Sequence, residues 1–274
     1  MFCKRDEFMS RLDGKIAIVT GAAMGIGAST AQALAEGGAY IVVTDIQDGK
    51  GTVDTIFESG GKAEFLHLNV TEEVRWKDVI EDVCTRLGGL DIVVNNAAVD
   101  KIKLLKDTTL EHWEWTMRVN VNSVFLGTKY GVWGMTEGST VRPKGGSIIN
   151  ISSAAALVGI MGHTHYAASK GAIAAFTRAA ALECGVMGTG VRVNTICPGA
   201  VQTPLLERIF LPGLVGLGLA KDPEELIKNH LQMIPLGRIA DAKEVGNAVR
   251  FLASDDASYI TGITMPVDGG MTAI

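Results

Sequence analysis

Tyr166 and Lys170 are a pair of side chains whose types and spacing could carry out proton transfer. They are four residues apart in a segment with helical periodicity, so both would project from one face of a helix. A phenol has a pKa near ~10, and a neighbouring ammonium group lowers that pKa. Tyr166 could therefore act as a general acid or base near neutral pH. Alone the pattern is weak, because on most helices it is a core aromatic residue beside a solvated lysine.

A glycine-rich turn near the start of the chain could bind phosphate. Gly21, Gly25 and Gly27 follow the apolar segment 15–20 and open a segment with helical spacing, 25–36. Glycines let a pyrophosphate approach the helix N-terminus, where free N–H groups and the positive end of the helix dipole favour a polyanion. Glycines also simply end strands, but this position between strand and helix indicates a dinucleotide site.

Asp45 ends the next apolar segment, 40–44, where a carboxylate can accept hydrogen bonds from an adenosine ribose. The same carboxylate would repel a 2′-phosphate, and neither Met24 nor Ile46 supplies a basic side chain to reverse that preference. An aspartate here could instead cap the next helix. Together with the glycine turn, Asp45 favours NAD over NADP.

Short apolar segments that alternate with amphipathic ones must position these residues. The expected strands are 15–20, 40–44, 63–68, 91–94, 147–151, 191–196 and 264–267, and the expected helices are 25–36, 72–87, 107–133, 165–187 and 241–253. This alternation predicts a parallel sheet covered on both faces. We predict an α/β protein with one Rossmann-type doubly wound domain of about seven strands over residues 12–274. Residues 1–11 are an N-terminal extension without an assigned function, and 204–235 is expected to form a lid.

The bulk composition argues against several classes of protein. The chain has 274 residues, 47% of them hydrophobic, and a net charge of −5, which argues against a nucleic-acid partner. The four cysteines are far apart and lack metal-site spacing, so no metal is expected. No segment reaches the ~20 apolar residues of a membrane span, and no signal-peptide core is present. We expect a soluble, cytoplasmic protein that does not bind membranes.

The order of the motifs resembles that of the short-chain dehydrogenase/reductase family over nearly the whole chain, from about Leu12 to Met271. The motifs are Thr20–Gly27, Asn95-Asn96-Ala97-Ala98, Asn120, Ser152-Ser153, Tyr166-Ala167-Ala168-Ser169-Lys170 and Pro198-Gly199. The resemblance implies a catalytic tetrad of Asn120, Ser153, Tyr166 and Lys170.

Each member of the implied tetrad has an expected role. Tyr166 would exchange a proton with the substrate oxygen, and Lys170 would lower the Tyr pKa and hold the nicotinamide ribose. Asn120 would anchor a relay water, which suits an amide with both donors and an acceptor. Ser153 lies thirteen residues before Tyr166, the usual interval in the family. Ser152 is the less favoured candidate, and its structural role would be a hydrogen bond at the strand end.

The resemblance also implies a set of contacts to the cofactor NAD. Those residues are Gly21, Met24, Gly25, Ile26, Gly27, Asp45, Ile46, Asn69, Val70, Asn96, Ala97, Ala98, Tyr166, Lys170, Pro198, Gly199, Val201 and Thr203. Asn69 stands where many members have aspartate, and Ala98 replaces the usual glycine. Val201 and Thr203 would meet the nicotinamide carboxamide.

The expected substrate walls are mainly apolar. They comprise Ser153, Ala155, Leu157, Met161, His163, Tyr166, Leu205 and Leu206. We therefore expect a hydrophobic secondary alcohol or ketone, which could be alicyclic, aromatic or steroid-like. His163 would line the cleft, whereas His165 would lie at the helix start or on the surface. No carboxylate or thiol is apparent nearby that would complete a metal site with them.

Two other functions share part of this pattern. A 3-oxoacyl-carrier-protein reductase would have the same catalytic motifs, but such enzymes usually prefer NADP, which Asp45 opposes. A non-catalytic dinucleotide-binding regulator would not need the intact tetrad. The resemblance further implies a homotetramer formed through the helices 107–133 and 165–187 and the C-terminal strand.

Overall fold

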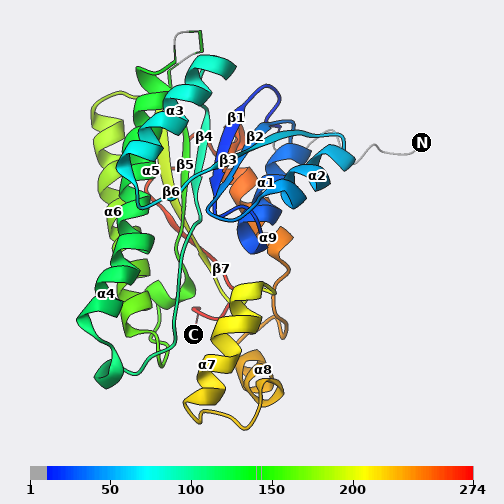
Figure 1. Ribbon diagram of the computed structural model, residues 1–274, viewed down its shortest axis with the longest axis vertical. Helices are drawn as coiled ribbons and strands as arrows, with labels where there is room; N and C mark the ends of the chain where they lie inside the picture. Colours follow the sequence, from blue (N-terminus) through cyan, green and yellow to red (C-terminus); the bar gives the residue numbers. More distant parts are fainter. Residues whose placement is uncertain (1–10, 140, 143, 274) are drawn as a thin grey trace.

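A seven-stranded parallel sheet organises the chain, as Figure 1 shows. The computed structural model describes residues 11–139, 141–142 and 144–273. Its strands are β1 Ile16–Thr20, β2 Tyr40–Asp45, β3 Lys62–His67, β4 Ile92–Asn95, β5 Gly146–Ile151, β6 Val191–Pro198 and β7 Thr264–Val267. The order is β3-β2-β1-β4-β5-β6-β7. The strands β2 and β3 are added on one side of β1 and the later strands on the other, so the strand order reverses between the parallel neighbours β1 and β4. That switch point is where doubly wound sheets bind ligands, and the topology confirms the predicted Rossmann-type fold.

Alternate residues of β1 separate the core into two layers. Ala17 and Val19 pack with α1 Gly25–Glu36, α2 Lys50–Glu58 and α9 Ala242–Ala253. Ile16 and Ile18 pack with α3 Glu73–Leu87, α5 Ser123–Thr136 and α6 Thr164–Val186. Figure 1 shows these two sets of helices on opposite sides of the sheet. The buried, β-branched strands are explained by this double cover.

The helix expected over 107–133 is interrupted, and in this detail the prediction is wrong. The helix α4 Leu110–Met117 begins after Thr109, whose side chain accepts a hydrogen bond from His112 N. A π-helical turn, Arg118–Asn122, then separates α4 from α5. The hydrophobic periodicity runs through this turn because a single π turn inserts one residue without stopping the helix.

The segment 204–235 is mostly helical, whereas the sequence suggested a lid or binding loop. It contains a π-helical turn, Leu206–Phe210, followed by α7 Leu211–Gly216 and α8 Pro223–Gln232. Asp222 caps α8 by accepting a hydrogen bond from Glu225 N at 2.8 Å. Figure 1 shows α7 and α8 grouped at one end of the sheet.

Of the proposed extension 1–11, only Arg11 lies within the described residues. Its Nε is 2.7 Å from Asp13 Oδ2. No helix of the described part is long and apolar enough to cross a membrane.

Candidate active site

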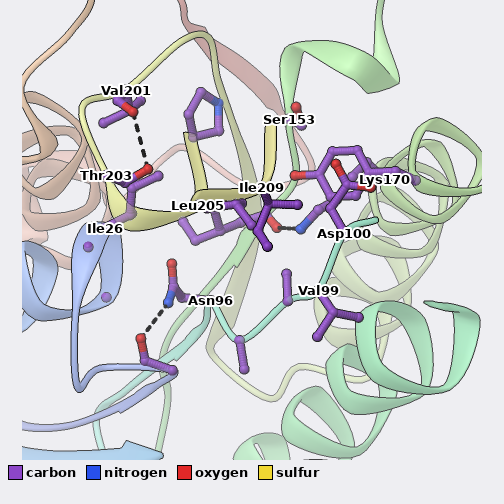
Figure 2. Close-up of a pocket in the computed structure, with 18 of the residues that line it drawn as sticks. Ile26, Asn96, Val99, Asp100, Ser153, Lys170, Val201, Thr203, Leu205 and Ile209 are labelled. Atoms are coloured by element: carbon purple, nitrogen blue, oxygen red, sulfur yellow. Dashed lines mark hydrogen bonds between the residues drawn. The ribbon is translucent and has the colours of Figure 1, made fainter. Parts of the chain in front are cut away.

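A cleft of about 820 Å³ runs along the carboxyl ends of the central strands. All the residues expected to contact NAD line it, from Gly21 after β1 to Thr203 after β6. Figure 2 shows Ile26 and Asn96 toward one end of this cleft and Ser153, Asp100 and Lys170 toward the other. The nucleotide-type turn and the proton-transfer residues therefore share one continuous cavity.

The glycine turn fits a phosphate group closely. Gly21 and Gly25 have φ angles of +62° and +59°, which side chains other than glycine rarely adopt. A Cβ on Gly27 would lie 2.1 Å from the Gly21 carbonyl oxygen, so only glycine fits there. No side chain caps the start of α1. Asn96 braces the turn by donating from Nδ2 to Thr20 O at 2.8 Å and to Gly21 O at 3.1 Å.

Asp45 is buried at the end of β2 and fixes the same turn. Its Oδ2 accepts from Ala23 N at 3.0 Å, and its Oδ1 accepts from Gln47 N at 3.0 Å. It does not cap the next helix, because Gly49 is the N-cap residue of α2. The described lining residues of the turn 21–27 and of the stretches 45–47 and 68–71 include no basic side chain. The carboxylate therefore meets the cleft without a compensating cation.

Lys170 holds its ammonium group in the interior, beside the ring of Tyr166. Both residues lie on α6, and Lys170 Nζ is 5.4 Å from the centre of the Tyr166 ring. Nζ donates to Ile151 O at 3.0 Å, and the lysine side chain is 2% exposed. Burial lowers the pKa of Lys170 to about 8. At neutral pH the group is still an ammonium, but it is close to losing its charge.

The pKa of Tyr166 is raised, which corrects the expectation that Lys170 would lower it. Desolvation is the largest cause, the charge of Asp100 adds to it, and a hydrogen bond with Ser153 opposes both. The phenol thus stays protonated in the protein alone, ready to donate a proton.

Asn120 is fully buried in the π-helical turn and does not line the cleft. Its Oδ1 accepts from Val99 N at 2.8 Å, and its Nδ2 donates to Val99 O at 2.9 Å and to Ser169 Oγ at 3.1 Å. Both amide hydrogens are therefore engaged by the protein, and the carbonyl oxygen accepts one hydrogen bond. Asn120 instead joins the segment after β4 to α6.

Ser152 and Ser153 have different surroundings. Ser152 Oγ donates to Lys170 O at 2.8 Å, which ties the end of β5 to α6. Ser153 precedes a short helical turn, and its Oγ accepts a hydrogen bond from Ala155 N at 3.2 Å. Its hydroxyl also forms a hydrogen bond with the Tyr166 side chain. The serine beside the phenol is therefore Ser153, as expected.

The expected substrate residues separate into two groups. Ala155, His163, Leu205 and Leu206 line the cleft together with Ser153 and Tyr166. Leu157 and Met161 are not among the lining residues, and their side chains are 43% and 57% exposed, so we do not retain them in the site. Both lie in the irregular stretch before α6, where no strand or helix periodicity indicates which side chains point into the cleft.

The structure adds lining residues that the sequence did not single out, above all Asp100. This carboxylate follows Val99 and is buried against two histidines: His163 Nε2 is 3.0 Å from Oδ2, and His165 Nε2 is 3.4 Å from Oδ1. Of the two positions expected for His165, the helix start is confirmed because α6 begins at Thr164, whereas the surface is wrong because the residue is fully buried. The expectation that no carboxylate lies near the histidines is also wrong. Among the described residues, no group of three or more His, Cys, Asp or Glu could hold a metal ion.

Comparison with known proteins shows the class. A family profile described as enoyl-(acyl carrier protein) reductase matches residues 21–272. A short-chain type dehydrogenase/reductase from Mycobacterium marinum superposes with a TM-score of 0.84 at 31% identity, covering 96% of this chain and 98% of that one. The chain belongs to the short-chain dehydrogenase/reductase family. It is an oxidoreductase of CH–OH groups, and the family binds a nicotinamide dinucleotide.

Curated relatives with different named activities have similar sequence identities to the chain. Cyclopentanol dehydrogenase from Comamonas is 38% identical over 97% of this chain and all of that protein. A 2,5-dichloro-2,5-cyclohexadiene-1,4-diol dehydrogenase from Sphingobium indicum is 36% identical over 95% of this chain and 97% of its own length. A 3-oxoacyl-[acyl-carrier-protein] reductase from Thermotoga maritima is also 36% identical, over 95% and 99%. A solved structure from Agrobacterium tumefaciens with bound NADP has a TM-score of 0.83 at 29% identity.

Proposed function

We propose that the protein is an NAD-dependent dehydrogenase that interconverts a hydrophobic secondary alcohol and its ketone, with Tyr166 as general acid and base. The observation that carries this proposal is one cleft that joins the glycine turn to Tyr166, Ser153 and Lys170. The substrate would be alicyclic, aromatic or steroid-like.

Proton transfer is assigned to the phenol. In ketone reduction Tyr166 donates its proton to the carbonyl oxygen, and in alcohol oxidation it takes the hydroxyl proton. Ser153, hydrogen-bonded to Tyr166, positions the substrate oxygen against the phenol. Lys170, when protonated, places a positive charge 5.4 Å from the centre of the Tyr166 ring. The nicotinamide, when bound, supplies or accepts the hydride.

NAD is the preferred nucleotide in this proposal. Asp45 presents a carboxylate where the adenosine ribose would lie, and the neighbouring described lining residues carry no cation for a 2′-phosphate. The residues fit a dinucleotide because Gly21 and Gly27 have no room for a Cβ and Gly25 has a positive φ angle, which keeps the turn tight at the start of α1. The relative with bound NADP makes this preference a point to be tested on this chain.

The apolar side of the cleft supports the substrate class. Leu205, Leu206, Ile209 and Phe210 line it from the lid segment, and Ala155 and Ile160 line it from the stretch before α6. Relatives named for cyclopentanol and for a cyclohexadiene diol also act on cyclic alcohols. An apolar wall favours a ring without phosphate or carboxylate groups.

A 3-oxoacyl-carrier-protein reductase is the alternative, and the Thermotoga relative at 36% identity favours keeping it. Such reductases act on a thioester chain and usually prefer NADPH, whereas Asp45 opposes NADPH. The two functions therefore differ in both nucleotide and substrate.

Assembly as a homotetramer is part of the proposal. Phe125 on α5 and Leu182 and Val186 on α6 leave apolar side chains exposed, with Val186 79% exposed. These are the two helices through which the family resemblance predicts assembly, and such a patch is typical of a subunit interface.

Turnover of a panel of compounds tests the proposal. The panel contains cyclopentanol, cyclohexanol, a hydroxysteroid, an aromatic secondary alcohol and a 3-oxoacyl thioester, each assayed with NAD(H) and with NADP(H). We expect NAD reduction with at least one cyclic or aromatic alcohol and tighter binding of NADH than NADPH in a fluorescence titration. Tighter NADPH binding with turnover of the thioester alone would favour the reductase instead.

A further inference from the structure

A buried polar cluster interrupts the apolar substrate side of the cleft. Asp100 and His163 both line the cavity, and their side chains are 5% and 2% exposed. The cavity wall also contains Val99, Ile160 and Phe210, which offer no polar side-chain atoms. Buried polar groups cost free energy unless they are hydrogen-bonded, so a carboxylate in such a wall requires partners.

The His163 ring lies between a backbone carbonyl and the Asp100 carboxylate. Nδ1 of His163 lies 2.9 Å from Met161 O, and a carbonyl oxygen only accepts, so Nδ1 carries hydrogen. Nε2 lies 3.0 Å from Asp100 Oδ2. Nε2 of His163 is therefore within ion-pair distance of the carboxylate.

The carboxylate of Asp100 retains capacity for one more donor. Oδ1 accepts from Lys101 N at 2.8 Å and has His165 Nε2 at 3.4 Å, while Oδ2 faces His163. Burial alone would raise the pKa of Asp100, but the hydrogen bonds and charge of the histidines outweigh it and lower that pKa. An ionised carboxylate offers about four lone-pair positions. One backbone N–H donor and two histidine nitrogens approach them, and the side chain borders the cavity.

This cluster lies next to the reacting atoms. The His163 ring packs edge-on against Tyr166, with ring centroids 5.9 Å apart, and against Phe210 of the lid segment at 5.0 Å. The negative charge of Asp100 is strong enough at Tyr166 to raise the pKa of the phenol. A substrate that presents one oxygen to Tyr166 and Ser153 would bring a nearby second group of the same molecule to Asp100.

We propose that Asp100, positioned by His163, accepts a hydrogen bond from a second hydroxyl of the substrate, so that the enzyme prefers a cyclic diol or hydroxyketone to a monofunctional alcohol. This inference rests on the proposed function and names its substrate more closely. The acceptor is a carboxylate, so it selects a donor and rejects a second carboxylate or phosphate.

Matched substrates test the proposal on the wild-type enzyme. Cyclohexanol is compared with the 1,2- and 1,4-cyclohexanediols, in both cis and trans forms, by kcat/KM for NAD reduction. A hydrogen bond to a charged acceptor predicts that at least one diol is preferred by about tenfold to a hundredfold. Equal or lower kcat/KM for every diol would overturn the proposal while leaving the proposed function intact. No turnover of any alcohol or diol would overturn both.

Variants separate binding of the hydroxyl from a structural role. Asp100→Ala should lower the ratio of kcat/KM for the preferred diol to kcat/KM for cyclohexanol at least tenfold, mainly through the KM of the diol. His163→Phe should reduce the diol preference, and His163→Gln, which keeps a donor toward Asp100, should restore part of it. Glu207→Gln removes a negative charge from the lid segment outside the cleft lining and should leave the preference unchanged. Equal losses for diol and monoalcohol in Asp100→Ala would show that the cluster only holds the loop, and would overturn the proposal.

Discussion

The buried ammonium group of Lys170 destabilises the folded protein. Burial lowers its pKa to about 8, against an ordinary 10.5. At pH 7 this difference corresponds to a destabilisation on the order of 3 kcal/mol. Below pH 8 both folded and unfolded chains bind the proton and the cost is full. Between about 8 and 10.5 the unfolded chain binds more protons, so stability from this group rises with pH.

Lys170→Met should therefore stabilise the protein without cofactor. We expect its free energy of unfolding at pH 7 to rise by about 1–2 kcal/mol, because a buried charge is replaced by an apolar chain of similar length. The gain should shrink as the pH approaches 10. Lys77→Met, at an exposed position of α3, should stay within about 0.5 kcal/mol. A destabilised Lys170→Met protein in urea denaturation would contradict this account.

At the scale of elements, the π-helical turn Arg118–Asn122 was not predictable from periodicity, because one inserted residue leaves the apolar pattern of the helix nearly unchanged. The lid helix α8 did carry a local signal. Asp222-Pro223 followed by Glu225 is a capping residue with proline in the first helical turn. In α7 the glycines hid the helix, although Pro212 also lies in its first turn.

The π-helical turn yields a prediction about Asn120. Asn120→Ala should lower the free energy of unfolding by about 2–4 kcal/mol, because Val99 N and Val99 O would both lose a partner in a mostly buried region. Asn122→Ala in the same turn, at an exposed position, is the matched control and should change stability by less than about 0.5 kcal/mol. Thermal denaturation measures both. An unchanged melting temperature for Asn120→Ala would contradict the bridging role of this side chain.

At the scale of the whole molecule, alternation of apolar strands with amphipathic helices was sufficient for the sheet and its two layers. The carboxyl ends of the strands then gather Gly21, Asp45 and Pro198 at one edge, which is why local motifs located the cleft. The Asp100 cluster could not be found this way. Its carboxylate and histidines come from segments far apart in the sequence, and only the packing of the β4 loop against the start of α6 brings them together.

Packing also decides the electrostatics of the site. The spacing of Tyr166 and Lys170 shows that they share a helix face, but not that Nζ hydrogen-bonds Ile151 O or that Asp100 lies near the phenol. The direction of a pKa shift depends on burial and on neighbours from other elements. The spacing therefore predicts the shared helix face, but it does not predict the direction in which the pKa of Tyr166 is shifted.

The central claim is that the Tyr166 hydroxyl transfers the proton, and one measurement tests it most directly: kcat of Tyr166→Phe for NAD-linked oxidation of the best cyclic alcohol. We predict a fall of about 10²–10⁴-fold, with NADH binding within threefold of wild type. Tyr259→Phe, at a fully exposed side chain, should retain wild-type kcat. Turnover of Tyr166→Phe within threefold of wild type would contradict the assignment.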